Sequence, residues 1–370
     1  MKNYAKKFFA ILLAVVFSVG IFLAVTALSR VSSSVSDTRV KIGFEQFYKQ
    51  KRNSLNVVLI GSSAVYREYM AIENWAEYGF TSYYLATMGQ SFNTTKYLIK
   101  EADKTQNPQL YVIEIRRLIK DIVTEWNGNQ QSENTGASVN RFLANCMTFS
   151  YNRYQMIKET MPDDIFYSYF DFIRNHSNWS DIPMSIFFDN LFTEITYSDY
   201  ISTKCANAIT TCKPLDAVER SNSAACTLPE NAKAVLDDLL SYIRENNINV
   251  LFLSTPYHQS TEYGTAENSV KEYLYSEGFT YLNCNEYYAE IDIDFLSDFY
   301  DEKHTNILGA LKVTGFIGEY INDHYFLDRN YSQKVTDDWD KALEAWEKER
   351  KILCVEAENN VREAKNGINT

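Results

Sequence analysis

Residues 57–64 have the sequence VVLIGSSA, in which an unbroken apolar run ends in a glycine and two serines. Continuous apolar runs of this kind are typical of parallel strands that are buried on both faces. In open α/β sheets, ligands bind outside the carboxyl ends of such strands. We therefore expect a buried strand here, with Gly61, Ser62 and Ser63 at the ligand-binding edge of the sheet.

Similar apolar runs recur along the chain and are separated by polar or helical sequence. The runs are residues 55–60, 82–86, 110–115, 249–254 and 279–282, and the helical stretches include residues 94–102 and 232–245. Short hydrophobic strands that alternate with helices are typical of a parallel sheet covered on both faces. The sequence predicts an α/β fold with a parallel sheet of about five strands.

Composition limits the classes of protein to be considered. The chain has 370 residues, of which 45% are hydrophobic and 23% charged, as in folded proteins. The formal net charge of −12 argues against nucleic acid as a partner, because phosphate binding needs clustered Lys and Arg. Six cysteines without a CxxC pair favour neither a disulfide scaffold nor a zinc ribbon. A single bridge between Cys205 and Cys212 stays open outside the cell, since sequence does not fix connectivity.

The N-terminal segment predicts a membrane anchor. Three lysines within the first seven residues precede an uncharged run over residues 8–28, which as a helix would span about 31 Å and cross a bilayer. The positive flank predicts a cytoplasmic N-terminus, with the rest of the chain outside. We expect residues 1–30 to form a cytoplasmic tip and a single-pass signal anchor in the cell membrane. A cleaved signal peptide and a buried core helix are the alternatives.

The other boundaries follow from composition and spacing. Residues 31–53 are mostly polar and begin with several serines, which predicts a flexible stalk. Residues 54–330 would form the α/β domain, with an insertion at about 120–230, because the gap between the third and fourth strands far exceeds one crossover helix. Residues 331–370 carry apolar side chains at helical spacing among charges and predict an amphipathic helix that packs on the domain or on a partner.

The insertion is dense in aromatic residues, and two interpretations stay open. The rings could form the core of a helical subdomain, since aromatic side chains supply large buried area. They could instead form a lid whose exposed rings stack on sugars or contact a membrane partner. The residues concerned are Phe166, Tyr167, Tyr169, Phe170, Phe172, Trp179, Phe187, Phe188 and Phe192.

Residues 301–306, DEKHTN, place a carboxylate three residues before a histidine. At that spacing Asp301 can hydrogen-bond the imidazole of His304 and hold its tautomer, which leaves the other ring nitrogen free to take a proton from a serine. The competing interpretations are structural. Ser63 could have no role beyond capping the helix after the first strand. Asp301 could cap a later helix, and Glu302 could replace it as the partner of the histidine.

Three more residues lie near predicted strand ends. Glu114 and Arg116 follow the third strand and could form a structural ion pair there. His258 follows the fourth strand at the same edge of the sheet, where it is either a neighbour of the site or incidental.

The order and placement of these motifs resemble the SGNH/GDSL hydrolase superfamily. The resemblance is closest to its membrane-anchored branch, which contains the D-alanyl-lipoteichoic acid transfer protein DltD and the alginate-type O-acetyltransferases. It covers roughly residues 55–325, with the insertion poorly matched, and implies a flavodoxin-like three-layer fold. Residues 61–63 match the first block of the family with Ser62 in the usual Asp position, which implies that Ser63 is the nucleophile.

Two further blocks match the family. Asp301 and His304 match the final DxxH block as orienting acid and general base. Residues 88–90, MGQ, look like the second block, whose glycine N–H helps to bind the oxyanion. The resemblance thereby implies that Gly89 and Gln90 belong to the oxyanion and substrate-binding part of the site.

One block departs from the family pattern. The Gly-x-Asn-Asp motif expected after the third strand is missing, and residues 112–117, VIEIRR, stand in its place. The asparagine donor to the oxyanion is therefore absent, and Arg116 is the candidate substitute. Because one oxyanion donor can be worth about 10²–10³ in rate, the loss leaves open whether the chemistry is hydrolysis or transfer.

The resemblance and the external location together imply a serine esterase or O-acyltransferase of SGNH type. Its substrate would be an acyl ester of a cell-envelope or secreted glycan, and it would need no metal or organic cofactor. The alternative is a catalytically weak accessory or glycan-binding protein that partners a membrane-bound acyltransferase. The missing asparagine block and the long insertion favour this alternative, and the retained Ser63, Asp301 and His304 oppose it.

Overall fold

The structure, a computed structural model, describes residues 2–28, 35–128, 133–170, 173, 192–218 and 224–368. Its centre is a sheet of five parallel strands in the order β2-β1-β3-β4-β5. The strands are β1 (Val57–Gly61), β2 (Ser82–Ala86), β3 (Leu110–Glu114), β4 (Val250–Ser254) and β5 (Tyr281–Asn283). The predicted α/β fold with five parallel strands is therefore confirmed. The strand order is that of doubly wound sheets and reverses between β1 and β3, where such folds bind ligands.

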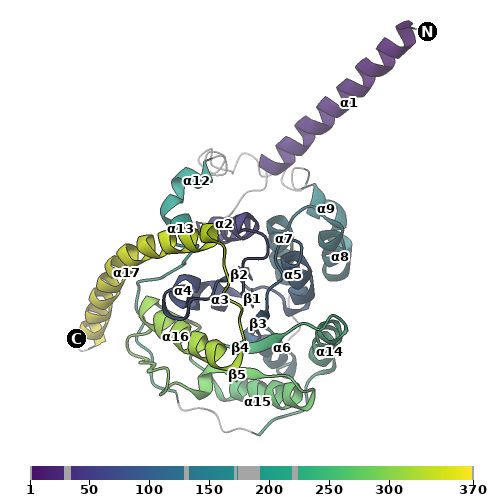
Figure 1. Cartoon of the computed structure of the whole chain (residues 1–370). Helices are drawn as coiled ribbons and strands as arrows, with labels where there is room; N and C mark the ends of the chain where they lie inside the picture. The colour runs from purple at the N-terminus through teal and green to yellow at the C-terminus, as the bar shows by residue number, and fades with distance from the viewer. Residues whose placement is uncertain are drawn as a thin grey trace.

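Helices cover both faces of the sheet (Figure 1). On one side α16 packs against α3 and α4, and on the other α5 packs on β1 while α14 and α15 contact α6. Every residue of β1, β2 and β3 is buried, which explains why these strands are nearly continuous apolar runs. The helices are α3 (Ser63–Glu68), α4 (Ala71–Tyr78), α5 (Thr95–Ala102), α6 (Arg116–Trp126), α14 (Glu230–Glu245), α15 (Thr261–Ser276) and α16 (Ile307–His324).

The segment predicted as a flexible stalk needs correction. Its residues Val35–Lys49 form helix α2, which packs against β2. Val40, Phe44 and Phe47 recur at helical spacing on α2 and are buried in the main core. The composition of the segment is polar, but its few apolar residues share one face, and that face binds the sheet. The residues 31–34 of the predicted stalk lie outside the described part of the chain.

The described parts of the insertion are mainly helical up to Ser202 and irregular over residues 206–218 and 224–229. The helical part consists of α7 (Glu133–Cys146), α8 (Tyr151–Thr160), the short 3₁₀ turn η2 (Pro162–Asp164), α9 (Ile165–Tyr169), α12 (Thr193–Thr196) and α13 (Ser198–Ser202). Helix α7 packs against α8 and α9. The buried side chains of this region include Leu143, Met156 and Ile157 rather than the aromatic residues singled out in the sequence.

The aromatic residues of the insertion differ among themselves. Phe166, Tyr167 and Phe192 are exposed, whereas Tyr169 and Phe170 are half-buried. The interpretation as a subdomain core therefore does not hold for the three exposed rings. The remaining four, Phe172, Trp179, Phe187 and Phe188, lie outside the described residues.

All six cysteines are free thiols, so the bridge between Cys205 and Cys212 is not formed. Cys205 is fully buried, and this burial raises the pKa of its thiol to about 12. The thiol therefore stays protonated and serves as a small core side chain.

The C-terminal segment forms one long helix, α17 (Gln333–Ile368), which packs on α4, α13 and α16. Trp339 and Trp346 of α17 are fully buried in the contact. Arg350 of α17 forms an ion pair of 2.9 Å with Glu73 of α4. The apolar stripe predicted from sequence thus packs on the α/β domain itself.

The N-terminal helix α1 (Lys2–Leu28) projects from the body of the molecule (Figure 1). Its stretch Tyr4–Phe22 has a mean hydropathy of 2.0, and none of it is buried. Among the described residues it is the one helix long and apolar enough to cross a membrane. A core helix would be buried, so that alternative is excluded, while a signal sequence shares these features with an anchor.

Candidate active site

Three side chains from distant parts of the sequence meet at the carboxyl edge of the sheet. Ser63 Oγ lies 2.7 Å from His304 Nε2, although the two residues are 241 positions apart. His304 Nδ1 lies 3.0 Å and 3.1 Å from the two carboxylate oxygens of Asp301. With the proton on Nδ1, the histidine donates to Asp301 and accepts from the serine. This is the arrangement in which a histidine can act as base toward a serine hydroxyl.

Ser63 is presented by the turn between β1 and α3. Ser62 has an extended backbone and precedes the helix, and Ser63 is the first helical residue, so helix hydrogen bonds do not use its N–H. The hydroxyl of Ser63 contacts His304 rather than capping α3. A side chain at Gly61 would bring its Cβ within 2.6 Å of the Glu114 Cβ, so only glycine lets β1 and β3 approach this closely.

Asp301 and His304 lie on a two-stranded antiparallel ribbon formed by β6 (Phe299–Asp301) and β7 (His304–Thr305). Asp301 also accepts a hydrogen bond of 2.7 Å from the Lys303 N–H, which fixes the carboxylate within its own turn. Glu302 turns away and pairs with Lys213 at 2.9 Å, so it is not the partner of the histidine. Asn306, and not Asp301, caps the following helix α16.

The environment of the triad sets its charges. Burial lowers the pKa of His304 below its ordinary value of 6.5, and the positive charges of Arg116 and Arg67 act in the same direction, against the carboxylate of Asp301. Burial alone would raise the pKa of Asp301, but hydrogen bonds from His304 and the Lys303 N–H outweigh it and lower the pKa from 3.8. At neutral pH the histidine is therefore a neutral base beside an ionised carboxylate.

The imidazole is also held by packing. The ring of Tyr300 stacks on His304 with a centroid distance of 5.4 Å and an interplanar angle of 11°. Tyr300 directly precedes Asp301, so one short ribbon carries both the orienting acid and the stacking ring. Tyr300 could not be predicted from the sequence, because a tyrosine before a DxxH motif has no distinguishing pattern in a chain with 27 tyrosines.

A buried carboxylate links the turn before Ser63 to β3. Glu114, at the end of β3, accepts hydrogen bonds from the Ser62 N–H at 3.2 Å and from the Ser62 hydroxyl at 2.9 Å. Its other oxygen accepts from the Arg116 N–H at 2.6 Å. Glu114 is only 2% exposed, so these bonds determine the conformation of the turn before Ser63.

Arg116 contacts the turn between Asp301 and His304. Its guanidinium donates to the Lys303 carbonyl at 2.6 Å and contacts the Pro256 carbonyl at 3.4 Å. It also forms ion pairs with Glu68 at 3.1 Å and Glu114 at 3.5 Å. These four partners involve all three guanidinium nitrogens, so the contacts described here give Arg116 a positioning role beside the expected role of oxyanion donor. The expected structural pair of Glu114 with Arg116 is present within this network.

Glu68, at the end of α3, is the second residue that the sequence analysis missed. It is fully buried, and burial raises its pKa from 4.5 to about 8, against the charge of Arg116. The carboxyl group of Glu68 therefore keeps its proton to higher pH than an exposed glutamate, although the charge of Arg116 opposes this. Glu68 stands five residues after Ser63, but nothing in that spacing indicates burial beside an arginine of another strand end.

Gly89 and Gln90 form the turn after β2. Gly89 has a φ of +61°, a region that favours glycine, and its carbonyl accepts from Arg117 at 3.1 Å. Within the described part of the chain, the Gly89 N–H has no protein acceptor. Gln90 is buried, and its side-chain oxygen accepts from the Thr87 N–H at 3.2 Å. Gln90 thus closes the turn, and Gly89 offers the free N–H.

His258 lies beside the catalytic ribbon without joining the triad. Its N–H donates to the Glu302 carbonyl at 2.9 Å, and its ring meets Phe295 edge-on with centroids 6.2 Å apart. The backbone after β4 is therefore attached to the turn between Asp301 and His304. His258 is a neighbour of the site through its backbone.

The described residues include no group of three or more His, Cys, Asp or Glu side chains that could hold a metal ion. No protein-family model matches the chain. Among the curated proteins, no sequence match is found either. The geometry of Ser63, His304 and Asp301, together with the residues that position them, is the basis for a function of this protein.

Proposed function

We propose that the protein is a membrane-tethered, extracytoplasmic serine esterase or O-acyltransferase of SGNH type. The observation that carries the proposal is the continuous hydrogen-bonded chain from Ser63 through His304 to Asp301 at the carboxyl edge of the sheet. A serine in this arrangement is activated for attack on an acyl carbonyl. The neutral state that burial favours for His304 supports the same role.

The proposed reaction proceeds in two steps that share one base. Ser63 Oγ attacks the acyl carbonyl while His304 Nε2 takes its proton, and the N–H groups of Ser63 and Gly89 stabilise the oxyanion. The intermediate collapses as His304 returns the proton to the departing alcohol oxygen, which leaves an acyl-serine. A water or a second hydroxyl then attacks the acyl carbonyl and gives its proton to His304. His304 passes this proton to Ser63 Oγ as the bond between Oγ and the acyl group breaks. Water gives hydrolysis, and a sugar hydroxyl gives transfer.

The substrate class follows from location. An anchor that holds the domain outside the cytoplasm favours a cell-envelope or secreted glycan that loses or receives an acyl group. Because the family's asparagine donor is missing, small esters such as p-nitrophenyl acetate should react slowly. A native glycan should react faster, because remote contacts lower the energy of the transition state.

A serine-directed fluorophosphonate probe tests the proposal. The wild-type chain should be labelled covalently, and Ser63→Ala should abolish labelling. Ser276→Ala is the matched control, because Ser276 is exposed and its hydroxyl donates to the Tyr273 carbonyl of α15; this variant should retain labelling. Equal labelling of the wild type and Ser63→Ala would reject Ser63 as the nucleophile.

The location is tested separately. A reporter fused after Thr370 should be active only outside the cytoplasm, and the protein should stay in membranes after an alkaline carbonate wash. Recovery of a shortened soluble product would mean that residues 1–30 are a cleaved signal.

The accessory function remains the second candidate. It is favoured by the exposed rings of Phe166, Tyr167 and Phe192, which a glycan or a membrane-bound acyltransferase could contact. Envelope-glycan acylation in cells that carry Ser63→Ala or His304→Ala distinguishes the two functions. Unchanged acylation at normal protein levels would favour the accessory function over catalysis.

A further inference from the structure

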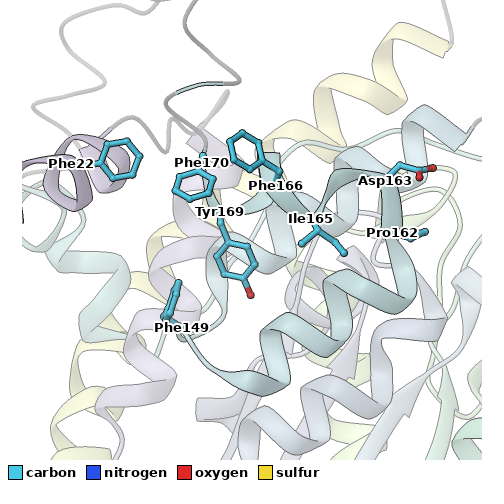
Figure 2. Close-up of a pocket in the computed structure, with 8 residues that line it drawn as sticks. All are labelled: Phe22, Phe149, Pro162, Asp163, Ile165, Phe166, Tyr169 and Phe170. Carbon is cyan, nitrogen blue, oxygen red and sulfur yellow. The ribbon is translucent and has the colours of Figure 1, made fainter. Parts of the chain in front are cut away.

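An apolar pocket lies where the N-terminal helix meets the insertion. Its volume is about 650 Å³. Figure 2 shows Phe22 of α1 on one side of it and a group of rings from the insertion on the other. The main lining residues are Phe22, Phe149, Ile165, Phe166, Tyr169 and Phe170.

The rings of this pocket contact one another but still face outward. The Phe22 and Phe170 rings lie 5.6 Å apart, and Phe170 lies 4.7 Å from Phe166. Phe149 is 78% exposed and Phe166 is 53% exposed. Water-exposed apolar clusters of this kind mark contact surfaces in folded proteins. We call the cluster made by Phe149, Phe166, Tyr169 and Phe170 the aromatic surface.

The length of the membrane-spanning stretch determines the depth of the aromatic surface relative to the bilayer. The uncharged run over residues 8–28, about 31 Å as a helix, is close to the thickness of the hydrocarbon core. Phe22 lies six residues before the end of this run, about 9 Å inside the outer boundary of the hydrocarbon. Since Phe170 is in ring contact with Phe22, the aromatic surface lies at the headgroup–acyl boundary or just below it. In Figure 1, α9 lies at the end of the body from which α1 projects.

We propose that the aromatic surface inserts into the headgroup–acyl boundary of the lipid bilayer around α1. Phe and Tyr rings are favoured at this depth, because they combine apolar area with tolerance of the polar interface. The occupant is lipid rather than a protein because the surface is continuous with the anchor that already enters the bilayer. A zwitterionic lipid suits the rim, where Asp163 would repel an anionic headgroup.

The same surface connects to the candidate active site. Helix α7 packs against α9, and Val139 of α7 lies 3.8 Å from the place where a Cβ at Gly89 would be. If α9 is inserted in the bilayer, its contact with α7 would hold the turn that contains Gly89, the proposed oxyanion donor, at a fixed distance from the bilayer surface. This proposal depends on the anchor but not on the chemistry of Ser63.

Tryptophan fluorescence in vesicles tests the insertion. The full-length chain is reconstituted in phosphatidylcholine vesicles whose acyl chains are brominated close to the headgroup, because bromine quenches nearby tryptophans. Phe149→Trp and Phe166→Trp report on the aromatic surface. Tyr275→Trp is the matched control, since Tyr275 is 51% exposed on α15, at the far end of the body from α1 (Figure 1). The fluorescence of the wild-type tryptophans is subtracted.

We expect the added fluorescence of Phe149→Trp and Phe166→Trp to be quenched at least about twofold more than that of Tyr275→Trp. Quenching equal to the control in both variants would overturn the proposal and leave a water-facing or protein-binding surface. Failure of the chain to remain with the vesicles would overturn it as well. Fluorophosphonate labelling of Ser63 in the same samples reports on the proposed function independently.

Discussion

The catalytic edge of the sheet and the aromatic surface are built from opposite kinds of contact. At the catalytic edge, polar atoms of Ser63, His304 and Asp301 are paired through directional hydrogen bonds between segments 241 positions apart. The aromatic surface joins rings that come mainly from one stretch, residues 149–170, through undirected contacts that leave much of their area exposed.

This difference predicts how each region responds to substitution. A hydrogen-bonded network fails when one atom is changed, because the partner group is left unpaired. A surface that binds through apolar area loses only the part of its binding free energy that the altered side chain contributes. Single substitutions should therefore have large effects on turnover at the catalytic edge and small ones at the aromatic surface.

Ser63→Ala should have the largest effect on turnover. The change removes the nucleophile itself, so hydrolysis of p-nitrophenyl acetate should fall by about 10⁴-fold or more. Steady-state kinetics on the full-length protein measure the loss, and circular dichroism checks that the fold is intact. A loss below tenfold would mean that another group attacks the ester.

Asp301→Asn should follow closely. An asparagine cannot hold the proton on Nδ1 of His304 as a carboxylate does, so turnover should fall by about 10³–10⁴-fold without loss of the fold. Glu302→Gln is the matched control, because Glu302 pairs with Lys213 instead of the histidine. Equal losses in the two variants would contradict the assignment of Asp301 as the orienting acid.

Arg116→Met tests the positioning role through two readouts. The Lys303 carbonyl loses its 2.6 Å donor, so the turn that carries His304 should shift and turnover should fall by about 10²-fold. The charge of Arg116 lowers the pKa of His304, so its removal should raise that pKa. Since the neutral histidine is the active base, the acid limb of the pH–rate profile should move to higher pH.

The wild-type acid limb should itself lie below about pH 6.5, because burial lowers the pKa of His304 from that value. Lys303→Gln is the control, because it keeps the backbone carbonyl that Arg116 binds. This variant should change turnover by less than about twofold and leave the acid limb of the pH–rate profile in place. An unmoved acid limb in Arg116→Met would reduce Arg116 to a purely structural role.

Glu68→Gln should change the pH dependence of stability. Burial raises the pKa of Glu68 from 4.5 to about 8, so the folded state binds this proton more tightly than the unfolded state. The stability that this proton contributes is complete below about pH 4.5 and is lost as the pH rises through about 8. The fall in Tm between about pH 5 and about pH 9 should be smaller in Glu68→Gln than in the wild type. An identical fall in Tm in both proteins would mean that the ionisation of another group causes the loss of stability.

Phe166→Ser should have the smallest effect on soluble substrates. The side chain is 53% exposed and lies outside the triad, so turnover of p-nitrophenyl acetate should change by less than about twofold. A larger loss would mean that Phe166 affects turnover directly and not only through the position of the protein on the bilayer.

The main elements of the fold could be predicted from the sequence because their signals are local. The run at residues 57–61 is buried on both faces, and so are the runs that became β2 and β3. Alternation of such runs with helices implies a parallel sheet. Asp301 and His304 could also be selected as candidates from the sequence, because they lie within one turn of each other.

The sequence could not show which side chains meet across the fold. In α2, a polar composition concealed the apolar face formed by Val40, Phe44 and Phe47, because composition ignores direction around a helix. The aromatic residues near position 166 were ambiguous between core and surface, since the chemistry of a ring does not reveal its burial.

By itself, the sequence determined the parallel α/β sheet, the apolar N-terminal helix and the presence of carboxylates within one turn of His304, because each depends on residues close together in the chain. The tertiary structure alone decided that Asp301 rather than Glu302 pairs with His304, that Ser63 reaches His304 and that Arg116 binds the Lys303 carbonyl. The last two contacts join segments that approach only when β1, β3 and the β6–β7 ribbon assemble at one edge. Their geometry is set by packing between elements, which spacing along the chain does not encode.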